Sequence, residues 1–282
     1  MMKLSLMTFM CEMVLLMGGA SKEEIQIEVE KILSDTHDAG FTLVDMTEKM
    51  IHEVGEEKLQ EFLNEYQLAL NCLICMADFA SNRADDEEIQ QEVVQCLEMA
   101  SHFGTKLLML VPAGEADGTK EEMGKNLIRR FSRAVGIAEK YGITCVIEDD
   151  PKRNIPMCSR QELLKLVEEV PGIKIVYDTA NVIMAGEDPI EDFEELKDHI
   201  VHMHLKDIGK PSASALFIDK ADDGEAYMCV SHGKGIVDLS GVINAAGKSG
   251  YEGTMAIEYM PNPDLDRKED LAEIYQMFCA RD

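Results

Sequence analysis

The chain has 282 residues, of which 46% are hydrophobic, so it is long enough for one large domain or two small ones with an apolar core. Acidic residues outnumber basic residues by 54 to 27, which gives a formal net charge of −27. This charge repels phosphate backbones and argues against a nucleic-acid partner, although a local basic pocket could still hold one small phosphate.

Residues 1–20 combine one lysine with an apolar run and therefore resemble a secretion signal. Glu12 interrupts the run and no A-x-A cleavage site follows, so we expect a first core strand here instead. No window reaches the roughly 18 uninterrupted apolar residues of a membrane span, so we expect no membrane partner.

The eight cysteines are scattered along the chain. Without a secretion signal they are typical of reduced thiols in a cytoplasmic protein. Cys72 and Cys75 form a C-x-x-C within the apolar run LALNCLICM, and no second pair completes a zinc site. A buried strand is therefore the expected structure of this segment.

Short apolar runs alternate with longer amphipathic segments along the whole chain. The runs predict strands at 3–9, 41–46, 69–76, 106–111, 144–148, 174–178, 200–205 and 254–259. They are nearly continuous rather than alternating, as in the strands of a buried parallel sheet. Eight strand–helix units in a chain of this length predict an α/β protein made of a single (β/α)8 TIM-barrel domain over residues 1–282.

The segments between the strands carry signals for the start and end of helices. Capping boxes begin at Ser21, Thr119 and Ser159, Asp85 with Glu88 forms an acidic relative, and Asp188 precedes Pro189. The glycines that precede strands and could end helices are Gly40, Gly104, Gly142, Gly172 and Gly253.

One predicted connection, at about 208–237, is unusually long. After the seventh strand of a barrel it would lie over the C-terminal face, where active sites are built. The DDG at 222–224 lies between two short apolar runs and predicts a small hairpin. Phe217, Ile218 and Tyr227 favour a lid over a disordered connection.

Each of the last four predicted strands ends near a residue that can bind a metal, namely Glu148, Asp178, His204 and Glu258. In a barrel these strand ends meet at one mouth. Three carboxylates cannot share a small apolar mouth unpaired, because repulsion and desolvation are too costly, and a divalent cation removes that cost. One imidazole among carboxylates favours Mn²⁺, and Mg²⁺, Co²⁺ and Zn²⁺ also suit the set. The alternative is that each is a lone polar residue where a strand meets water.

The segment HMHLKD at 202–207 places polar residues at alternate positions, so His202, His204 and Lys206 share one face of the strand. Lys206 is either a substrate contact that neutralises an anion or an exposed lysine at a strand end. His202 either supports the metal ligands by a hydrogen bond or is a satisfied core histidine.

Five segments, taken in order, resemble the sugar phosphate isomerase/epimerase family, part of the xylose-isomerase-like barrel superfamily that also contains endonuclease IV. They are VIEDD (146–150), VYDTANVIMAGEDP (176–189), HMHLKD (202–207), HGKG (232–235) and AIEY (256–259). The resemblance covers the whole chain in its strand rhythm and is specific from about residue 143 to residue 260. It implies a carbohydrate as the small-molecule substrate and a homo-oligomer.

The resemblance also implies one divalent metal ion held by Glu148, Asp178, His204 and Glu258, with Glu148 and Glu258 as catalytic proton carriers. In such relatives the metal holds two adjacent oxygens of a sugar or sugar phosphate. A glutamate removes the proton from the carbon between them, and the metal stabilises the resulting enediolate as a Lewis acid. Return of the proton gives an epimer or an isomer.

Many relatives carry a histidine three residues after the aspartate of strand six, where this chain has Asn181. An asparagine can hydrogen-bond a sugar hydroxyl but cannot act as a general base. A turn-forming asparagine is the alternative. Together with Lys206, His202 and His232 of the HGKG turn, Asn181 makes up the set predicted to bind substrate.

Other functions remain open on the same scaffold. A dehydratase, or a lyase subunit that cleaves carbon-linked sugars, would also abstract a proton next to a carbonyl, and fold does not fix function. An endonuclease would need more histidine and aspartate ligands, and the net charge opposes it. A non-enzymatic sugar-binding protein would have little reason to keep two glutamates at one metal.

Overall fold

The computed structural model describes residues 3–114, 117–150, 154–212, 215, 217–221, 224–261 and 265–279. Parallel strands form a closed barrel in the order β1-β11-β7-β6-β5-β4-β3-β2. Their bounds are β1 Lys3–Met7, β2 Leu43–Thr47, β3 Ala69–Ala77, β4 Leu107–Pro112, β5 Thr144–Glu148, β6 Lys174–Asp178, β7 Ile200–Leu205 and β11 Thr254–Glu258. The predicted (β/α)8 barrel and its eight strands are confirmed, with small shifts at the strand ends.

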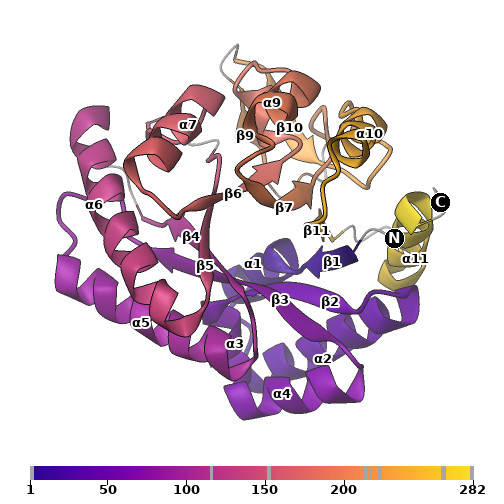
Figure 1. The fold of residues 1–282 in the computed structure, drawn as a ribbon. Coiled ribbons are helices and arrows are strands. Elements are labelled where there is room, and N and C mark those ends of the chain that lie inside the picture. The colour runs from indigo at the N-terminus through magenta and orange to yellow at the C-terminus, as the bar shows by residue number, and fades with distance from the viewer. Residues whose placement is uncertain are drawn as a thin grey trace.

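Most of the helices surround the strands on the outside of the barrel, whereas α1 lies within this ring of helices (Figure 1). Their bounds are α1 Phe9–Met17, α2 Lys22–Ala39, α3 Glu48–Val54, α4 Glu56–Glu65, α5 Asp86–His102, α6 Lys120–Ala138, α7 Arg160–Glu169, α8 Asn181–Met184, α9 Pro189–Leu196, α10 Leu239–Ser249 and α11 Arg267–Cys279, with a 3-10 turn at Glu139–Tyr141. Within the described part of the chain, no helix combines the length and apolar character that a membrane crossing requires.

The predicted helix starts follow local hydrogen bonding. Ser21 and Thr119 form full capping boxes, and Asp85 and Asp188 each accept two backbone N–H groups. Ser159 caps α7, but the side chain of Glu162 bonds the backbone N–H of Cys158 instead of closing the box.

One predicted helix end was wrong. Helix α10 ends at Ser249, and Gly250, with φ +78°, takes the left-handed cap that was predicted for Gly253. Gly253 serves packing instead, because a Cβ there would lie 2.2 Å from the Tyr251 hydroxyl and 2.5 Å from the Val201 carbonyl oxygen.

Apolar side chains fill two layers, one between strands and helices and one inside the barrel. Cys72 belongs to the inner layer and Cys75 to the outer layer, so the two thiols point to opposite faces of β3. Both lie in a buried strand, as predicted, and they cannot converge on one ion from opposite faces of the sheet.

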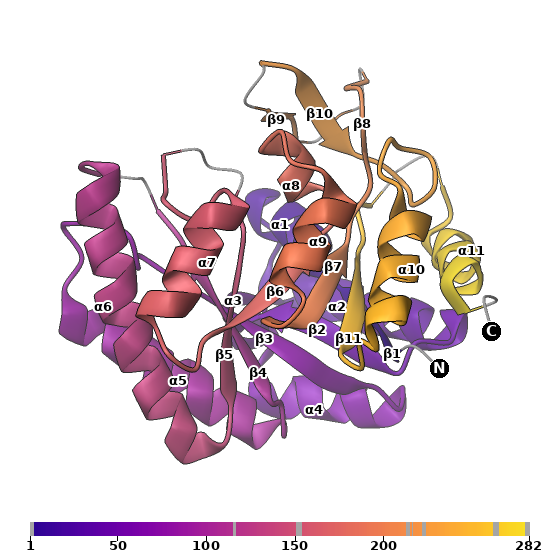
Figure 2. The same ribbon diagram turned by 45° about the horizontal axis from the view of Figure 1, so that its top comes forward.

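The long connection after β7 contains a small antiparallel sheet in the order β8-β10-β9, formed by β8 Ile208–Gly209, β9 Asp219–Lys220 and β10 Ala226–Cys229. Figure 2 shows this sheet beyond the end of the barrel at which β7 finishes. The predicted hairpin is confirmed by pairing of Lys220 with Ala226, while residues 222–223 of its DDG turn lie outside the described residues.

Candidate active site

The structure brings together the four residues predicted to bind metal. Glu148, Asp178 and Glu258 are the last residues of β5, β6 and β11, and His204 is the penultimate residue of β7. Asp178 lies directly opposite His204 in the strand register. One ligand atom from each of the four side chains lies within 4.8 Å of the others. The parallel strands therefore deliver the four groups to one point at the carboxyl end of the barrel.

Asp178 is held by one carboxylate oxygen and keeps the other unbonded. Its Oδ1 accepts the backbone N–H groups of Ala180 and Asn181, each at 2.7 Å, whereas the buried Oδ2 receives no hydrogen bond. Burial raises the pKa of Asp178 to about 8, although the ammonium of Lys206 opposes this shift. The side chain is thus fixed in direction and keeps one buried oxygen without a hydrogen bond.

His204 and Glu148 face each other, and His204 Nδ1 forms a hydrogen bond with Glu148 Oε1. Burial alone would lower the pKa of His204, but the carboxylates of Glu148 and Glu258 outweigh it and raise the pKa to about 9. The second ring nitrogen, Nε2, is buried and has no hydrogen-bond partner.

Lys206 links Glu258 to Asn181. Its Nζ lies 3.1 Å from Glu258 Oε1 and donates to Asn181 Oδ1 at 3.3 Å. Burial would raise the pKa of Glu258, but the charges of Lys206 and His204 dominate and lower it. Lys206 is buried and paired with Glu258, and is not an exposed lysine at a strand end.

This set of side chains fits a divalent cation. Three carboxylates crowd one buried point, and an oxygen of Asp178 is left without a bond. A buried carboxylate oxygen without a partner is costly, and metal coordination removes that cost. Three oxygen donors and one imidazole nitrogen suit Mn²⁺, Mg²⁺, Co²⁺ or Zn²⁺.

A cavity of about 390 Å³ opens at Glu148 and Glu258, whereas the fully buried Asp178 and His204 are not part of its lining. Its polar side includes Glu148, Asp149, Asn181, Lys206 and Glu258. Much of the remaining lining is apolar and includes the methionine wall, which we define as Met7, Met10, Met13, Met76, Met109 and Met157. From the long connection, Phe217 and Asp219 line the same cavity. The sequence contains 19 methionines, but their meeting on one wall was not predicted.

Asp149 was also missed. It lines the cavity, is buried, and neither of its carboxylate oxygens has a hydrogen-bond partner. Burial, followed by the charges of Asp178 and Glu148, raises its pKa well above the ordinary value. Its backbone carbonyl accepts the amide of Asn181 at 2.9 Å, which fixes Asn181 at the cavity. Its position directly after Glu148 at a strand end was the available signal.

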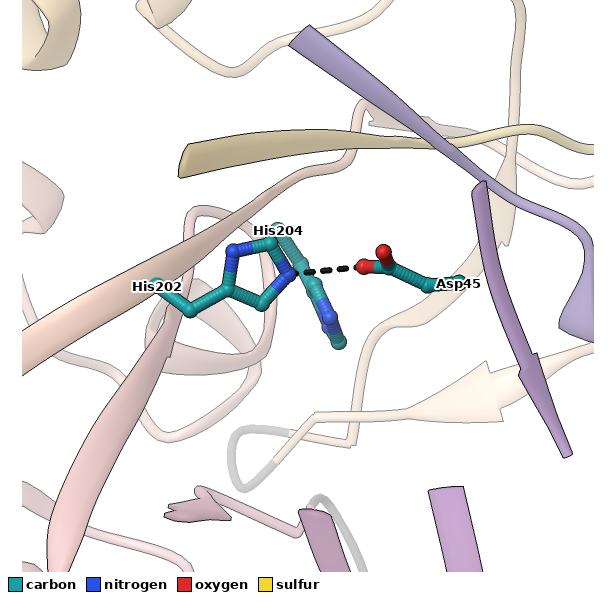
Figure 3. A group of neighbouring side chains, drawn as sticks. All are labelled: Asp45, His202 and His204. Atoms are coloured by element: carbon teal, nitrogen blue, oxygen red, sulfur yellow. Dashed lines mark hydrogen bonds and ion pairs between the residues drawn. The ribbon is translucent and has the colours of Figure 1, made fainter. Parts of the chain in front are cut away.

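His202 was predicted to bind substrate, but it lies among the buried residues inside the barrel and is not part of the cavity lining. Its Nε2 contacts Asp45 Oδ2 at 2.7 Å, and Nδ1 lies 2.7 Å from Thr254 Oγ1. Figure 3 shows Asp45 pointing at the His202 ring with His204 beside them. The other oxygen of Asp45 accepts Ser5 Oγ at 2.6 Å and Asn71 Nδ2 at 2.8 Å.

His232 is likewise buried away from the cavity lining, where its Nε2 donates to the carbonyl of Leu205 at 2.6 Å. The HGKG turn instead encloses Asp207, whose Oδ2 accepts the N–H groups of Gly233 and Gly235 at 2.9 Å each. A Cβ at Gly235 would lie 2.0 Å from Asp207 Oδ1, so this position requires glycine. The HLKD and HGKG segments therefore bind each other.

Residues 33–278 match the family described as xylose isomerase-like TIM barrel. The chain belongs to this family. The resemblance found in the sequence is thereby confirmed.

The curated relatives of this chain have low sequence identity to it. An inosose dehydratase from Lacticaseibacillus casei is 24% identical over 132 residues, which are 45% of this chain and 43% of that protein. The chain thus matches less than half the length of that relative.

Two solved structures share the fold over nearly the whole chain. A D-allulose 3-epimerase from Methylomonas sp. in complex with D-allulose has a TM-score of 0.76 at 16% identity, with 100% of this chain and 97% of that chain covered. The IOLI protein with a binding zinc atom has a TM-score of 0.72 at 18% identity, with 98% and 97% covered. At these identities the likeness shows the fold alone.

Proposed function

We propose that this protein is a divalent-metal-dependent enzyme that removes a carbon-bound proton next to the carbonyl of a hydroxylated ketone and expels water. The observation that carries the proposal is the convergence of Glu148, Asp178, His204 and Glu258 within 4.8 Å at the barrel mouth. Loss of water is favoured over our first expectation, isomerisation or epimerisation, because inosose dehydratase is among the sequence relatives.

Glu148, Asp178, His204 and Glu258 would hold the ion. When bound, the cation supplies Lewis-acid stabilisation of the charge that develops on the carbonyl oxygen. The donor set favours Mn²⁺, and the likeness to a structure with a zinc atom adds Zn²⁺ to the ions to be tested. Asp178 serves only to bind, because its anchored Oδ1 fixes the direction of its free oxygen.

Proton transfer is assigned to the glutamates. Glu148 or Glu258 takes the proton from the carbon beside the carbonyl, and the electron pair of that C–H bond forms a carbon–carbon double bond. The hydroxyl group on the next carbon leaves with its bonding electron pair and takes up the proton that the glutamate removed, so that water is released and the ketone becomes an unsaturated ketone. Lys206, at 3.1 Å from Glu258, keeps that carboxylate ionised and oriented.

Epimerisation is the second candidate. It shares the first proton transfer and differs only in returning the proton to the opposite face of the same carbon. The likeness to D-allulose 3-epimerase over the whole chain supports it, and two glutamates at one centre can supply the two proton carriers. Many relatives carry a histidine where this chain has Asn181, and an asparagine cannot act as a base. This difference weighs against a reaction in which that histidine transfers the proton.

The first test is the metal content per chain after soaking in Mn²⁺ or Zn²⁺, measured by elemental analysis. We expect one ion per chain in the wild type and weaker binding in Glu258→Gln. Glu252→Gln, an exposed glutamate before β11, is the matched control and should bind as the wild type does. An absence of bound metal in the wild type under all conditions would refute the proposal, and three zinc ions per chain would revive the endonuclease.

The second test follows the reaction of inosose and D-allulose in D₂O by ultraviolet absorbance and NMR. Dehydration gives an unsaturated ketone that absorbs in the ultraviolet. Epimerisation gives deuterium at an inverted carbon without new absorbance. Loaded enzyme that exchanges no carbon-bound proton in a panel of hydroxyketones would contradict both candidates.

A further inference from the structure

We infer that the substrate is an uncharged hydroxyketone or polyol that carries an apolar, ring-sized group, rather than a bare sugar or a sugar phosphate. This inference rests on the proposed function and specifies the substrate class of the same site. It is carried by the two kinds of side chain in the cavity lining. Polar and charged groups come from the ends of β5, β7 and β11 and from Asn181, and the methionine wall comes from β1, β3, β4 and α1 with Met157.

The methionine wall is built from segments that are far apart in the chain. Met7 ends β1, Met10 and Met13 lie on α1, Met76 on β3 and Met109 on β4. Met157 precedes α7, and the phenyl rings of Phe9 and Phe217 extend the apolar surface. Separate elements thus converge to form this surface next to Glu148 and Glu258, the two proposed proton carriers.

A bare sugar does not match this surface. Its hydroxyl groups surround the rim of the molecule, and those placed against thioethers and phenyl rings would lose hydrogen bonds to water without replacement. A substrate with oxygens at one end can place them at Glu148, Asn181 and Lys206. Its apolar body would then displace water from the methionine wall, which is favourable.

A phosphate group does not match the charge of the cavity. Among the described residues of its lining, Lys206 is the one cation, and Glu258 already pairs with it at 3.1 Å. A divalent cation would offset two of the three carboxylate charges that hold it, and Asp219 adds a further acidic group to the lining. A dianionic phosphate placed among these carboxylates would be repelled.

The methionine side chain can adapt to apolar substituents of different shapes, so the wall does not select one fixed shape. Its side chain is unbranched and polarizable, adapts to irregular surfaces, and makes favourable contacts with aromatic rings. Six methionines on one wall therefore suit an aromatic or a bulky aliphatic substituent of variable outline.

The test is calorimetric binding of phenyl β-D-glucopyranoside, methyl β-D-glucopyranoside and glucose 6-phosphate to the Mn²⁺-loaded protein. We expect the phenyl compound to bind at least about tenfold more tightly than the methyl compound, a difference of about 1.4 kcal/mol. Glucose 6-phosphate should bind most weakly. Equal affinities for the phenyl and methyl compounds, or tightest binding of the phosphate, would overturn the inference.

Two partly exposed wall residues offer variants that leave the buried core intact, Met13→Gln and Met76→Gln. Each should lower the affinity for the phenyl compound severalfold and leave that for the methyl compound unchanged. Met17→Gln, at a side chain that is 68% exposed on α1, is the matched control and should change neither affinity. If the wall variants behave as Met17→Gln does, the methionine wall does not contact the substrate.

Metal content and proton exchange are measured on the same samples. Normal metal binding and exchange without a preference for the phenyl compound would refute this inference alone. A preference for the phenyl compound in a protein that binds no metal would refute the proposed function and leave the apolar site standing.

Discussion

Asp45 Oδ2 and His202 Nε2 lie 2.7 Å apart inside the barrel, although 157 positions separate the two residues in the sequence. Both side chains are completely buried. The ring of His202 stands nearly perpendicular to that of His204, with 5.2 Å between ring centres. The pair therefore supports, from inside the barrel, His204, the histidine that we propose as a metal ligand.

Replacing Asp45 should destabilise the fold strongly. Asp45→Ala leaves His202, Ser5 and Asn71 without their common acceptor, and we expect the free energy of unfolding to fall by about 3–5 kcal/mol. Urea denaturation measures the change. Asp198→Ala, at an exposed site, should stay within about 0.5 kcal/mol of the wild type. Similar losses of unfolding free energy in both variants would show that the buried hydrogen bonds of Asp45 do not stabilise the fold.

Lys206→Met should separate metal binding from catalysis. The ammonium lies 3.1 Å from Glu258 and repels a cation held by that carboxylate. We expect Mn²⁺ to bind at least about tenfold more tightly in the variant, because a nearby like charge contributes a few kcal/mol, while exchange of the carbon-bound proton is lost. Calorimetry and NMR give the two readouts, with the exposed Lys197→Met as control. Weaker Mn²⁺ binding would mean that Lys206 supports the site in another way.

Arg130 holds the segment between β3 and α5. Its guanidinium donates to Asp86 and to the backbone carbonyls of Asp78, Phe79, Ser81 and Ala84. Arg130→Ala removes these five buried or partly buried hydrogen bonds, so the free energy of unfolding should drop by about 3–5 kcal/mol. Arg133→Ala removes only partly exposed ion pairs from the same helix and should cost less than about 1 kcal/mol. Thermal or urea unfolding of both variants measures the two losses of stability. Equal losses would contradict the view that the burial of Arg130 makes its hydrogen bonds more stabilising.

Glu12 should make stability depend on pH. Burial raises its pKa from 4.5 to about 7, although hydrogen bonds from Thr47 and Thr8 oppose the shift. The folded state therefore binds more protons than the unfolded state between pH 4.5 and pH 7. The contribution of protonated Glu12 to the free energy of unfolding is complete below pH 4.5 and is lost as the pH rises to 7.

Glu12→Gln keeps a neutral acceptor for the two threonines and should remove this dependence. Relative to wild type, the variant should gain stability from pH 5 to pH 7.5, by up to about 3 kcal/mol. Exposed Glu23→Gln is the control. If the free energies of unfolding of wild type and Glu12→Gln change with pH in parallel, Glu12 does not cause the pH dependence.

The fold was predictable because its signals are local. Helix caps such as Ser21 and Thr119 act within one turn, and apolar runs mark buried strands without knowledge of their neighbours. The convergence of Glu148, Asp178, His204 and Glu258 followed from topology, since parallel barrel strands end at one mouth.

Features that depend on distant partners were not predictable. Asp45 looks like an ordinary strand residue until the barrel closes and brings His202 to it. Asp207 gives no sign in the sequence that the HGKG turn folds around its carboxylate. Predicting the methionine wall would require the direction of each side chain, and the sequence pattern does not give those directions.

Glu258 has a particular place in the order in which the chain is made. It lies at the end of β11, the last barrel strand in the sequence, and its register partner is Met7 of β1, the first. On the ribosome, Glu148, Asp178 and His204 emerge while the sheet is still open, and the set is completed only when β11 pairs with β1. A nascent chain stalled before β11 therefore carries three of the four groups and none of the finished cavity, so the site matures in the same event that closes the barrel.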